Sequence, residues 1–216
     1  MRHTLRLLAG TGAVAAALVA AAGPAQAHPA PAVLSTGHVD AIDVEFEDGE
    51  LELAIHDEES DAEFAPSEAV LLVKSQARTT IPADPAYAFL GRAGAPVWVL
   101  PEVQNPELLF AGLSAEELQP GVFTGDTIQI NLTGVRGPGD IAIFTQDAVG
   151  VPAVLADDTD GLPDTLPLAA GQHAHVNWAF GKAGVYRLTV TASATLAATG
   201  ETVTSDPAVY TFQVQR

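Results

Sequence analysis

Histidines at two places in the chain are the side chains best suited to chemistry. His173 and His175 lie within the segment 171–180, and on a β-strand two residues separated by one share a face, about 7 Å apart. Two imidazoles at this spacing can converge on one cation. The same alternation puts Asn177 beside them and Trp178 on the opposite, apolar face. An isolated His-x-His pair also fits an ordinary polar strand face, so further ligands must decide between the two interpretations.

A third histidine, His38, stands with Asp40 at the start of a predicted hairpin. The turn residues 48–49, Asp-Gly, are typical of a type I′ turn, which pairs residues whose numbers sum to 97 and puts Asp57 opposite Asp40. In this register His38, Asp40 and Asp57 continue the apolar face of the hairpin. Polar groups on such a face are costly unless they are paired or ligated, so the sequence predicts a site there.

We therefore expect His38, His173 and His175 to bind one divalent transition metal, with Asp40 or His56 as the fourth ligand. Three neutral imidazoles suit Zn²⁺, Cu²⁺ or Ni²⁺, whereas Mn²⁺ favours more oxygen ligands, and Zn²⁺ is the leading choice. Because imidazole must be neutral to bind a metal, affinity should fall as pH drops through about 6.5.

The remaining residues of the predicted site have weaker roles. The 97-sum register points His56 to the acidic outer face of the hairpin together with Asp43, unless a bulge redirects it. Asn177 or Asp57 is expected to orient an imidazole by a hydrogen bond.

Two further features carry alternative chemistry. Residues 158–164, DTDGLPD, resemble a calcium loop, but without a following bidentate glutamate they favour a solvated turn. Cleavage after Ala27 would expose His28 as an N-terminal copper chelator, although its HPAPA context is flexible.

No G-x-S-x-G elbow or nucleophile–base spacing is present, so we expect a binding protein rather than an enzyme. A metal-dependent hydrolase is the less favoured alternative.

Composition excludes several classes of protein. The 216 residues include 27 acidic and 9 basic side chains and no cysteine, for a formal charge of −18. Such a chain repels nucleic acid and has neither disulfides nor thiolate metal sites.

Residues 1–27 have the basic start, apolar run and A-x-A end of a signal peptide, which predicts a secreted or cell-surface protein. No membrane span or sorting signal follows, and residues 28–37 form a Pro/Ala-rich flexible leader.

Short alternating segments predict the scaffold that positions these residues. The hairpin is followed by a strand at 70–74, by a proline-rich region at 79–121 expected to be mostly loop with one helical turn near Ser114, and by further strands from Thr127 onward. This pattern indicates an all-β protein, an antiparallel β-sandwich that is immunoglobulin-like in its C-terminal half.

The expected core contains Trp178, Phe180, Tyr186, Leu188 and Val190, with Gly184-Val185-Tyr186 at the corner of a late strand. The pattern leaves open whether residues 38–216 are one domain or a hairpin-bearing part, 38–121, packed on a part comprising 122–216.

Three segments together resemble a known family. They are HVDA at 38–41, PVWVLP at 96–101, and HAHVNWAF at 173–180 followed by GVYRLTV at 184–190. They are similar to the actinobacterial surface-anchored protein domain, also known as the choice-of-anchor M domain, over nearly the whole chain after residue 27. The resemblance implies a secreted or wall-anchored domain that receives substrate for an anchored-repeat ABC transporter of the metal-uptake type and relays it. This chain lacks the sorting signal and second copy of the wall-anchored members, which favours a soluble, single-domain member.

The predicted function is thus an exported binding or relay protein for an ABC-type uptake system. Its expected partners are a metal ion or small solute, transporter components and wall-anchored homologues. The alternative is an extracellular adhesion or spacer module, which would need no histidine cluster.

Overall fold

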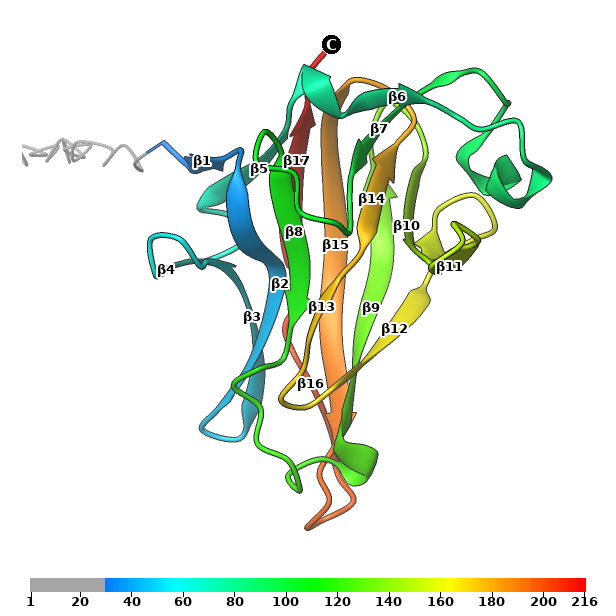
Figure 1. The fold of residues 1–216 in the computed structure, drawn as a ribbon. Helices are drawn as coiled ribbons and strands as arrows, with labels where there is room; N and C mark the ends of the chain where they lie inside the picture. Colours follow the sequence, from blue (N-terminus) through cyan, green and yellow to red (C-terminus); the bar gives the residue numbers. More distant parts are fainter. Residues whose placement is uncertain (1–29) are drawn as a thin grey trace, which may run out of the picture.

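The computed structural model describes residues 30–216, which form short strands joined by turns (Figure 1). The predicted signal peptide, His28 and the start of the leader lie outside the described residues. Part of the segment expected to be a flexible leader is ordered, since residues 32–34 form a strand that pairs with residues 69–71. In this part of the chain, no helix is long and apolar enough to cross a membrane.

The described strands form three sheets. In spatial order, the large sheet contains β1 (Ala32–Leu34), β5 (Ala69–Val73), β17 (Ala208–Val214), β15 (Gly184–Thr195), β9 (Thr127–Arg136) and β12 (Asp164–Ala169), and β16 (Thr202–Thr204) pairs with β15. The second sheet contains β11 (Pro152–Asp157), β10 (Ile141–Gln146), β14 (Asn177–Phe180), β7 (Pro96–Leu100) and β6 (Arg78–Thr80). The third, which we call the histidine sheet, contains β13 (His173–His175), β8 (Leu109–Ser114), β2 (Gly37–Glu47), β3 (Glu50–Asp57) and β4 (Ala62–Phe64).

The all-β class predicted from the sequence is confirmed. The helical segments of the described residues are short 3-10 turns: η1 (Ser75–Ala77), η2 (Pro85–Leu90) and η3 (Thr124–Asp126). The sheets are not purely antiparallel, however, because β1 and β17 both run parallel to β5, and β2 runs parallel to β8. The immunoglobulin-like character of the C-terminal half stays a prediction.

The first hairpin has the predicted turn. Asp48 and Gly49 both have positive φ, 49° and 91°, as a type I′ turn requires, and β2 and β3 pair on either side of them. From Asp43 to Glu47 the pairing follows the predicted register. Closer to His38 it does not, because a β-bulge between Asp40 and Asp43 shifts the register by one residue.

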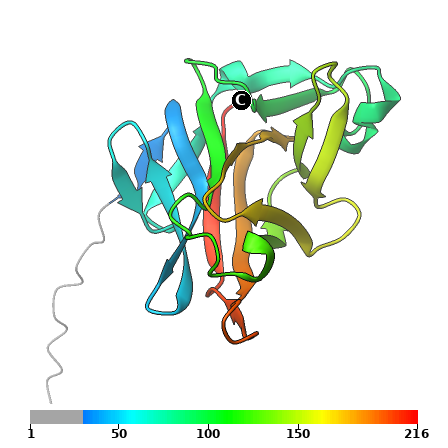
Figure 2. The same cartoon turned by 60° about the horizontal axis from the view of Figure 1, so that its bottom comes forward.

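The proline-rich region contains more regular structure than its composition predicts. Within residues 79–121 the structure has most of β6, and all of η2, β7 and β8. Figure 2 shows β8, in green, lying beside β2, in blue. Ser114 ends β8 instead of starting a helical turn, although its hydroxyl accepts a hydrogen bond from the Glu116 N–H (3.4 Å). The prolines therefore lie around β8 and not within it.

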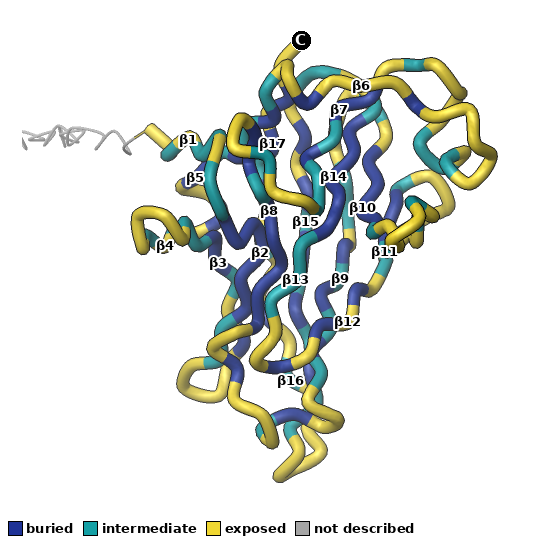
Figure 3. The backbone as a smooth tube through the Cα atoms, viewed as in Figure 1, coloured by how far each residue is buried: buried dark blue, intermediate teal, exposed yellow. Residues whose placement is uncertain are grey.

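The core lies between the sheets and is shared by both halves of the chain. Most buried apolar side chains form one large cluster that runs from Val39 to Val214, and a smaller cluster contains Ile81, Val97, Ala142, Phe144 and Ala179. Figure 3 shows burial in the middle of the strands and exposure in the loops. The five predicted core residues are all buried, at 0–1% exposure. Tyr186 also fixes the turn before β15, since its hydroxyl donates to the Lys182 carbonyl (2.9 Å) and accepts from the Lys182 N–H (3.0 Å).

Candidate metal centre

Three neighbouring strands bring the distant histidines together. In the centre of the histidine sheet, Gly112 of β8 pairs with Asp40 of β2 on one side and with His175 of β13 on the other. Paired residues share a face of the sheet, so the side chains of β2 and β13 project on the same side of β8. His38 and His173 extend this arrangement along their strands, on the same face.

Gly112 leaves the space that these side chains occupy. A Cβ atom at this position would lie 2.5 Å from His173 Nε2 and 2.9 Å from Asp40 Oδ1, closer than real Cβ contacts allow. The histidine and the carboxylate therefore lean over the glycine backbone from opposite sides. A glycine here has a steric role, because any side chain would fill the space in which they meet.

The three imidazoles surround one point. The ring centroids lie 4.6–4.8 Å apart, and one ligand nitrogen from each ring lies within 4.8 Å of the others. His38 Nε2 is 3.1 Å from His173 Nε2. Two nitrogens bound to one tetrahedral Zn²⁺ at about 2.0–2.1 Å lie roughly 3.3 Å apart, so this spacing is close to that of a metal site. His175 is held in place by stacking on Phe110, with ring centroids 3.4 Å apart.

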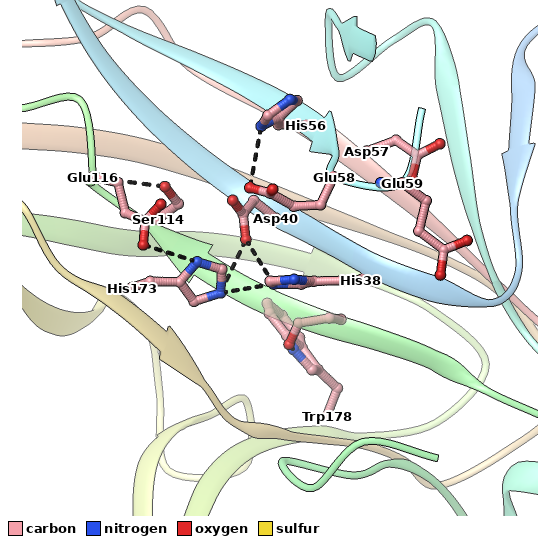
Figure 4. A network of polar contacts seen from close by, with 11 residues as sticks. His38, Asp40, His56, Asp57, Glu58, Glu59, Ser114, Glu116, His173 and Trp178 are labelled. Atoms are coloured by element: carbon pink, nitrogen blue, oxygen red, sulfur yellow. Dashed lines mark hydrogen bonds and ion pairs between the residues drawn. The ribbon is translucent and has the colours of Figure 1, made fainter. Parts of the chain in front are cut away.

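Asp40 supplies a carboxylate at the buried side of the cluster (Figure 4). Its Oδ1 atom is 3.1 Å from His173 Nε2 and 3.7 Å from His38 Nε2, and the residue is 1% exposed. Among the described residues, Oδ1 has no partner with hydrogen-bond geometry. A buried carboxylate oxygen without such a partner is costly, whereas a cation between these atoms would satisfy it. Asp40 thus places a carboxylate oxygen beside two of the three histidines that could hold a metal ion.

His173 and His175 are held in the neutral form that binds metal. Burial lowers the pKa of His173, and neighbouring His38 adds to this effect. Burial, together with His173 and His38, lowers the pKa of His175 to about 4. Both rings are therefore neutral at pH 7. His173 Nδ1 faces Glu116 Oε1 at 3.7 Å, and a proton on Nδ1 leaves the Nε2 lone pair directed to the cluster.

The Asp40 carboxylate lies close to other negatively charged carboxylates. Burial raises the pKa of Asp40 to about 7, with further contributions from the negative charges of Asp43 and Glu58. Asp43 is itself buried, and its Oδ1 has no hydrogen-bond partner in the part of the chain that the structure describes. A divalent cation would relieve this repulsion, because an opposite charge favours the ionised form of each carboxylate.

The β-bulge changes which hairpin residues belong to this face. It pairs Asp40 with His56, and Val39 with Asp57, so the predicted pairing of Asp40 with Asp57 is wrong. Asp57 instead accepts hydrogen bonds from Ser60 Oγ (2.5 Å) and the Glu59 N–H (3.3 Å) in the following turn. The bulge also directs Asp40 away from the apolar face it was predicted to continue. His56 keeps the face that the sequence predicts for it, together with Asp43, and the bulge brings Asp40 to that face. His56 therefore groups with Asp40 and Glu58 and not with the three histidines.

Asn177 is also absent from the set of orienting residues. The predicted strand 173–180 divides at Val176, and its two parts, β13 and β14, belong to different sheets. Asn177 lies in β14, where its side chain donates to the Phe144 carbonyl (3.2 Å) and accepts from the Glu102 N–H (3.1 Å). Glu116, which the sequence did not suggest for this purpose, faces the Nδ1 atom of His173.

The acidic loop that resembles a calcium site has the character of a turn. Asp158 Oδ1 accepts from the Ile141 N–H (2.8 Å), and Asp164 Oδ2 accepts from the Asp157 N–H (2.8 Å). These oxygens cap backbone groups instead of converging on one point.

Comparison with known proteins adds no family assignment. No family model matches this chain, and no curated protein matches it. The chemistry of the site is therefore argued from its own residues. His38, His173 and His175 could hold a metal ion, and Asp40 adjoins them.

Proposed function

We propose that this protein is an exported metal-binding protein that captures a divalent transition metal, Zn²⁺ first, and passes it to an ABC-type uptake system. The observation that carries the proposal is the convergence of three imidazoles, one of which, His173, meets the buried Asp40 carboxylate over Gly112. Ligands from β2 and β13, brought together across β8 at a residue without a side chain, match what a metal centre requires.

The arrangement suits capture and release. The His38 side chain is 32% exposed and that of His173 is 13% exposed, so the cluster is open to solvent, whereas Asp40 is 1% exposed. A formal charge of −18 surrounds the protein with a field that concentrates cations and speeds their arrival.

The same features argue against the alternative functions. An adhesion or spacer module would gain nothing from a buried carboxylate oxygen without a hydrogen bond, which lowers its stability. A catalytic zinc keeps one coordination position for water, whereas three histidines and Asp40 would fill a tetrahedral shell. The site therefore favours holding an ion over activating a water molecule.

The uptake role is supported by the sequence resemblance to the choice-of-anchor M domain and by the signal-like residues 1–27. It has its own test. A strain of the source organism that lacks this gene should accumulate radioactive zinc more slowly when free zinc is kept low by a chelator. Complementation with the wild-type gene, but not with the His173→Ala/His175→Ala gene, should restore uptake. Equal uptake in all strains would contradict the relay role.

The choice of metal is tested by dialysing the metal-free protein against equal concentrations of Zn²⁺, Mn²⁺ and Ca²⁺, followed by native mass spectrometry. We expect zinc to be retained, because imidazole-rich sites favour borderline metals. Retention of Mn²⁺ or Ca²⁺ in preference to Zn²⁺ would contradict the assignment.

A further inference from the structure

A second group of potential ligands lies next to the three histidines on the same face. It consists of Asp40, His56 and Glu58, whose ligand atoms lie within 4.8 Å of one another. Figure 4 shows Asp40 between the His38–His173 pair on one side and the Glu58 carboxylate on the other. Asp40 is thus common to both groups.

The backbone positions this second group as firmly as the first. His56 of β3 pairs directly with Asp40 of β2 as a consequence of the bulge, so the two side chains project side by side. Glu58 follows β3, and its backbone N–H donates to the His38 carbonyl (3.2 Å). This hydrogen bond holds the turn after β3 against the start of β2, within reach of both groups.

The chemistry of the second group suits a cation. His56 Nδ1 is 3.4 Å from Glu58 Oε1, and the side chains of these residues are 27% and 33% exposed, whereas Asp40 is 1% exposed. The group therefore has a buried carboxylate at one end and solvent at the other. Two carboxylates and one imidazole form a harder donor set than three imidazoles, so this set should bind Zn²⁺ more weakly and tolerate Mn²⁺ better.

We propose that Asp40, His56 and Glu58 form a second divalent-cation position that shares the Asp40 carboxylate with the three-histidine site. This inference rests on the proposed function, because the first position must bind a metal for the carboxylate to be shared. The second position, which is open to solvent through His56 and Glu58, gives an arriving ion a place beside Asp40, from which it reaches the imidazoles without leaving that carboxylate. The competing interpretation is a surface ion-pair network, since His56 Nε2 also lies 3.4 Å from Asp61 Oδ1.

The test is the zinc stoichiometry of the purified full-length protein, measured by equilibrium dialysis and elemental analysis over increasing Zn²⁺. We expect two equivalents for the wild type, the second at least tenfold weaker, and one equivalent for His56→Ala and for Glu58→Gln. Glu52→Gln is the matched control, because it removes one negative charge from an exposed position on β3 outside both groups. It should retain two equivalents.

The outcomes separate the two proposals. One equivalent in the wild type, unchanged in His56→Ala and Glu58→Gln and lost in His173→Ala/His175→Ala, would overturn the second position and leave the metal-binding function standing. No binding in the wild type would overturn both. Crystals grown with excess Zn²⁺ provide a check that needs no variant: an anomalous difference map should show one peak beside His173 and another beside His56. A single peak would overturn the inference.

Discussion

Replacing Gly112 by alanine should remove tight metal binding and leave the fold intact. The added Cβ would lie 2.5 Å from His173 Nε2 and 2.9 Å from Asp40 Oδ1. Non-bonded heavy atoms rest at about 3.5–4.0 Å, so each of these ligand atoms must retreat by about 1 Å. The displaced atoms are the ones that would bind the ion.

The expected effect on affinity is large compared with the effect on stability. Ligands must be held within about 0.5 Å of the productive geometry, and disturbing orienting residues alone typically costs about 10–100-fold in affinity. We therefore expect Kd for Zn²⁺ to rise by about 100-fold or more, equivalent to about 2.7 kcal/mol. An alanine also restricts the unfolded chain, which stabilises the fold by about 0.4–1 kcal/mol and offsets the cost of moving the partly exposed His173 ring.

Calorimetric zinc titration and urea unfolding of the metal-free protein measure these two quantities separately. Gly134→Ala is the control, because a Cβ at this strand position meets its nearest neighbour, Thr189 Oγ1, at an ordinary 3.5 Å. The control should bind zinc like the wild type. A Gly112→Ala variant that binds zinc with wild-type affinity would refute the reasoning, since the ligands would then not meet over this glycine.

The remaining predictions concern protonation and packing. The folded-state pKa of Asp40, about 7, lies above its unfolded value of 3.8, so the stability that the protonated group contributes is lost as pH rises from about 4 to 7. We therefore compare the free energy of unfolding of Asp40→Asn and of the wild type, measured in urea with a chelator present. The two should be equal near pH 4, and the variant should be more stable at pH 8 by on the order of 3–4 kcal/mol. Equal stability at pH 8 would contradict the raised pKa of Asp40. Zinc affinity of the wild type should fall as pH drops from 8 to 6 in calorimetry, because Asp40 must lose its proton to bind; a flat profile would exclude Asp40 as a ligand. Tyr186→Phe should lower the free energy of unfolding by about 1–2 kcal/mol through the lost bonds to Lys182 and leave zinc affinity unchanged, and a loss of affinity would show that the site depends on this turn.

Local patterns were sufficient to predict much of the fold. The alternation on either side of Asp48-Gly49 predicts β2, β3 and their turn, and the late alternating segments predict β15 and β17. β8 was missed because prolines surround it, although its residues 109–114, LFAGLS, are mostly apolar. Its pairing with both β2 and β13 joins residues far apart in sequence, and no local pattern specifies such contacts.

The candidate metal site, like the fold, was predicted in part from local patterns. The His-x-His pair and His38 were predicted from the alternation, but the partners of Asp40 were not. Consecutive apolar residues at Ala41 and Ile42 interrupt the alternation of β2, and this interruption is the sequence signal of the bulge. Because of the bulge, Asp40 pairs with His56 and not with Asp57. The role of Gly112 depends on which strands flank β8, so it could be recognised only in the structure.

The most direct test of the central claim is calorimetric titration of Zn²⁺ into the metal-free protein, purified without a polyhistidine tag, for the wild type and the His173→Ala/His175→Ala variant. The structure predicts saturable, stoichiometric binding to the wild type and a loss of at least about 100-fold in affinity when two of the three imidazoles that surround the site are removed. Absence of stoichiometric binding of Zn²⁺, Cu²⁺ or Ni²⁺ to the wild type, or equal binding by the double variant, would show that the histidines are only a polar strand face.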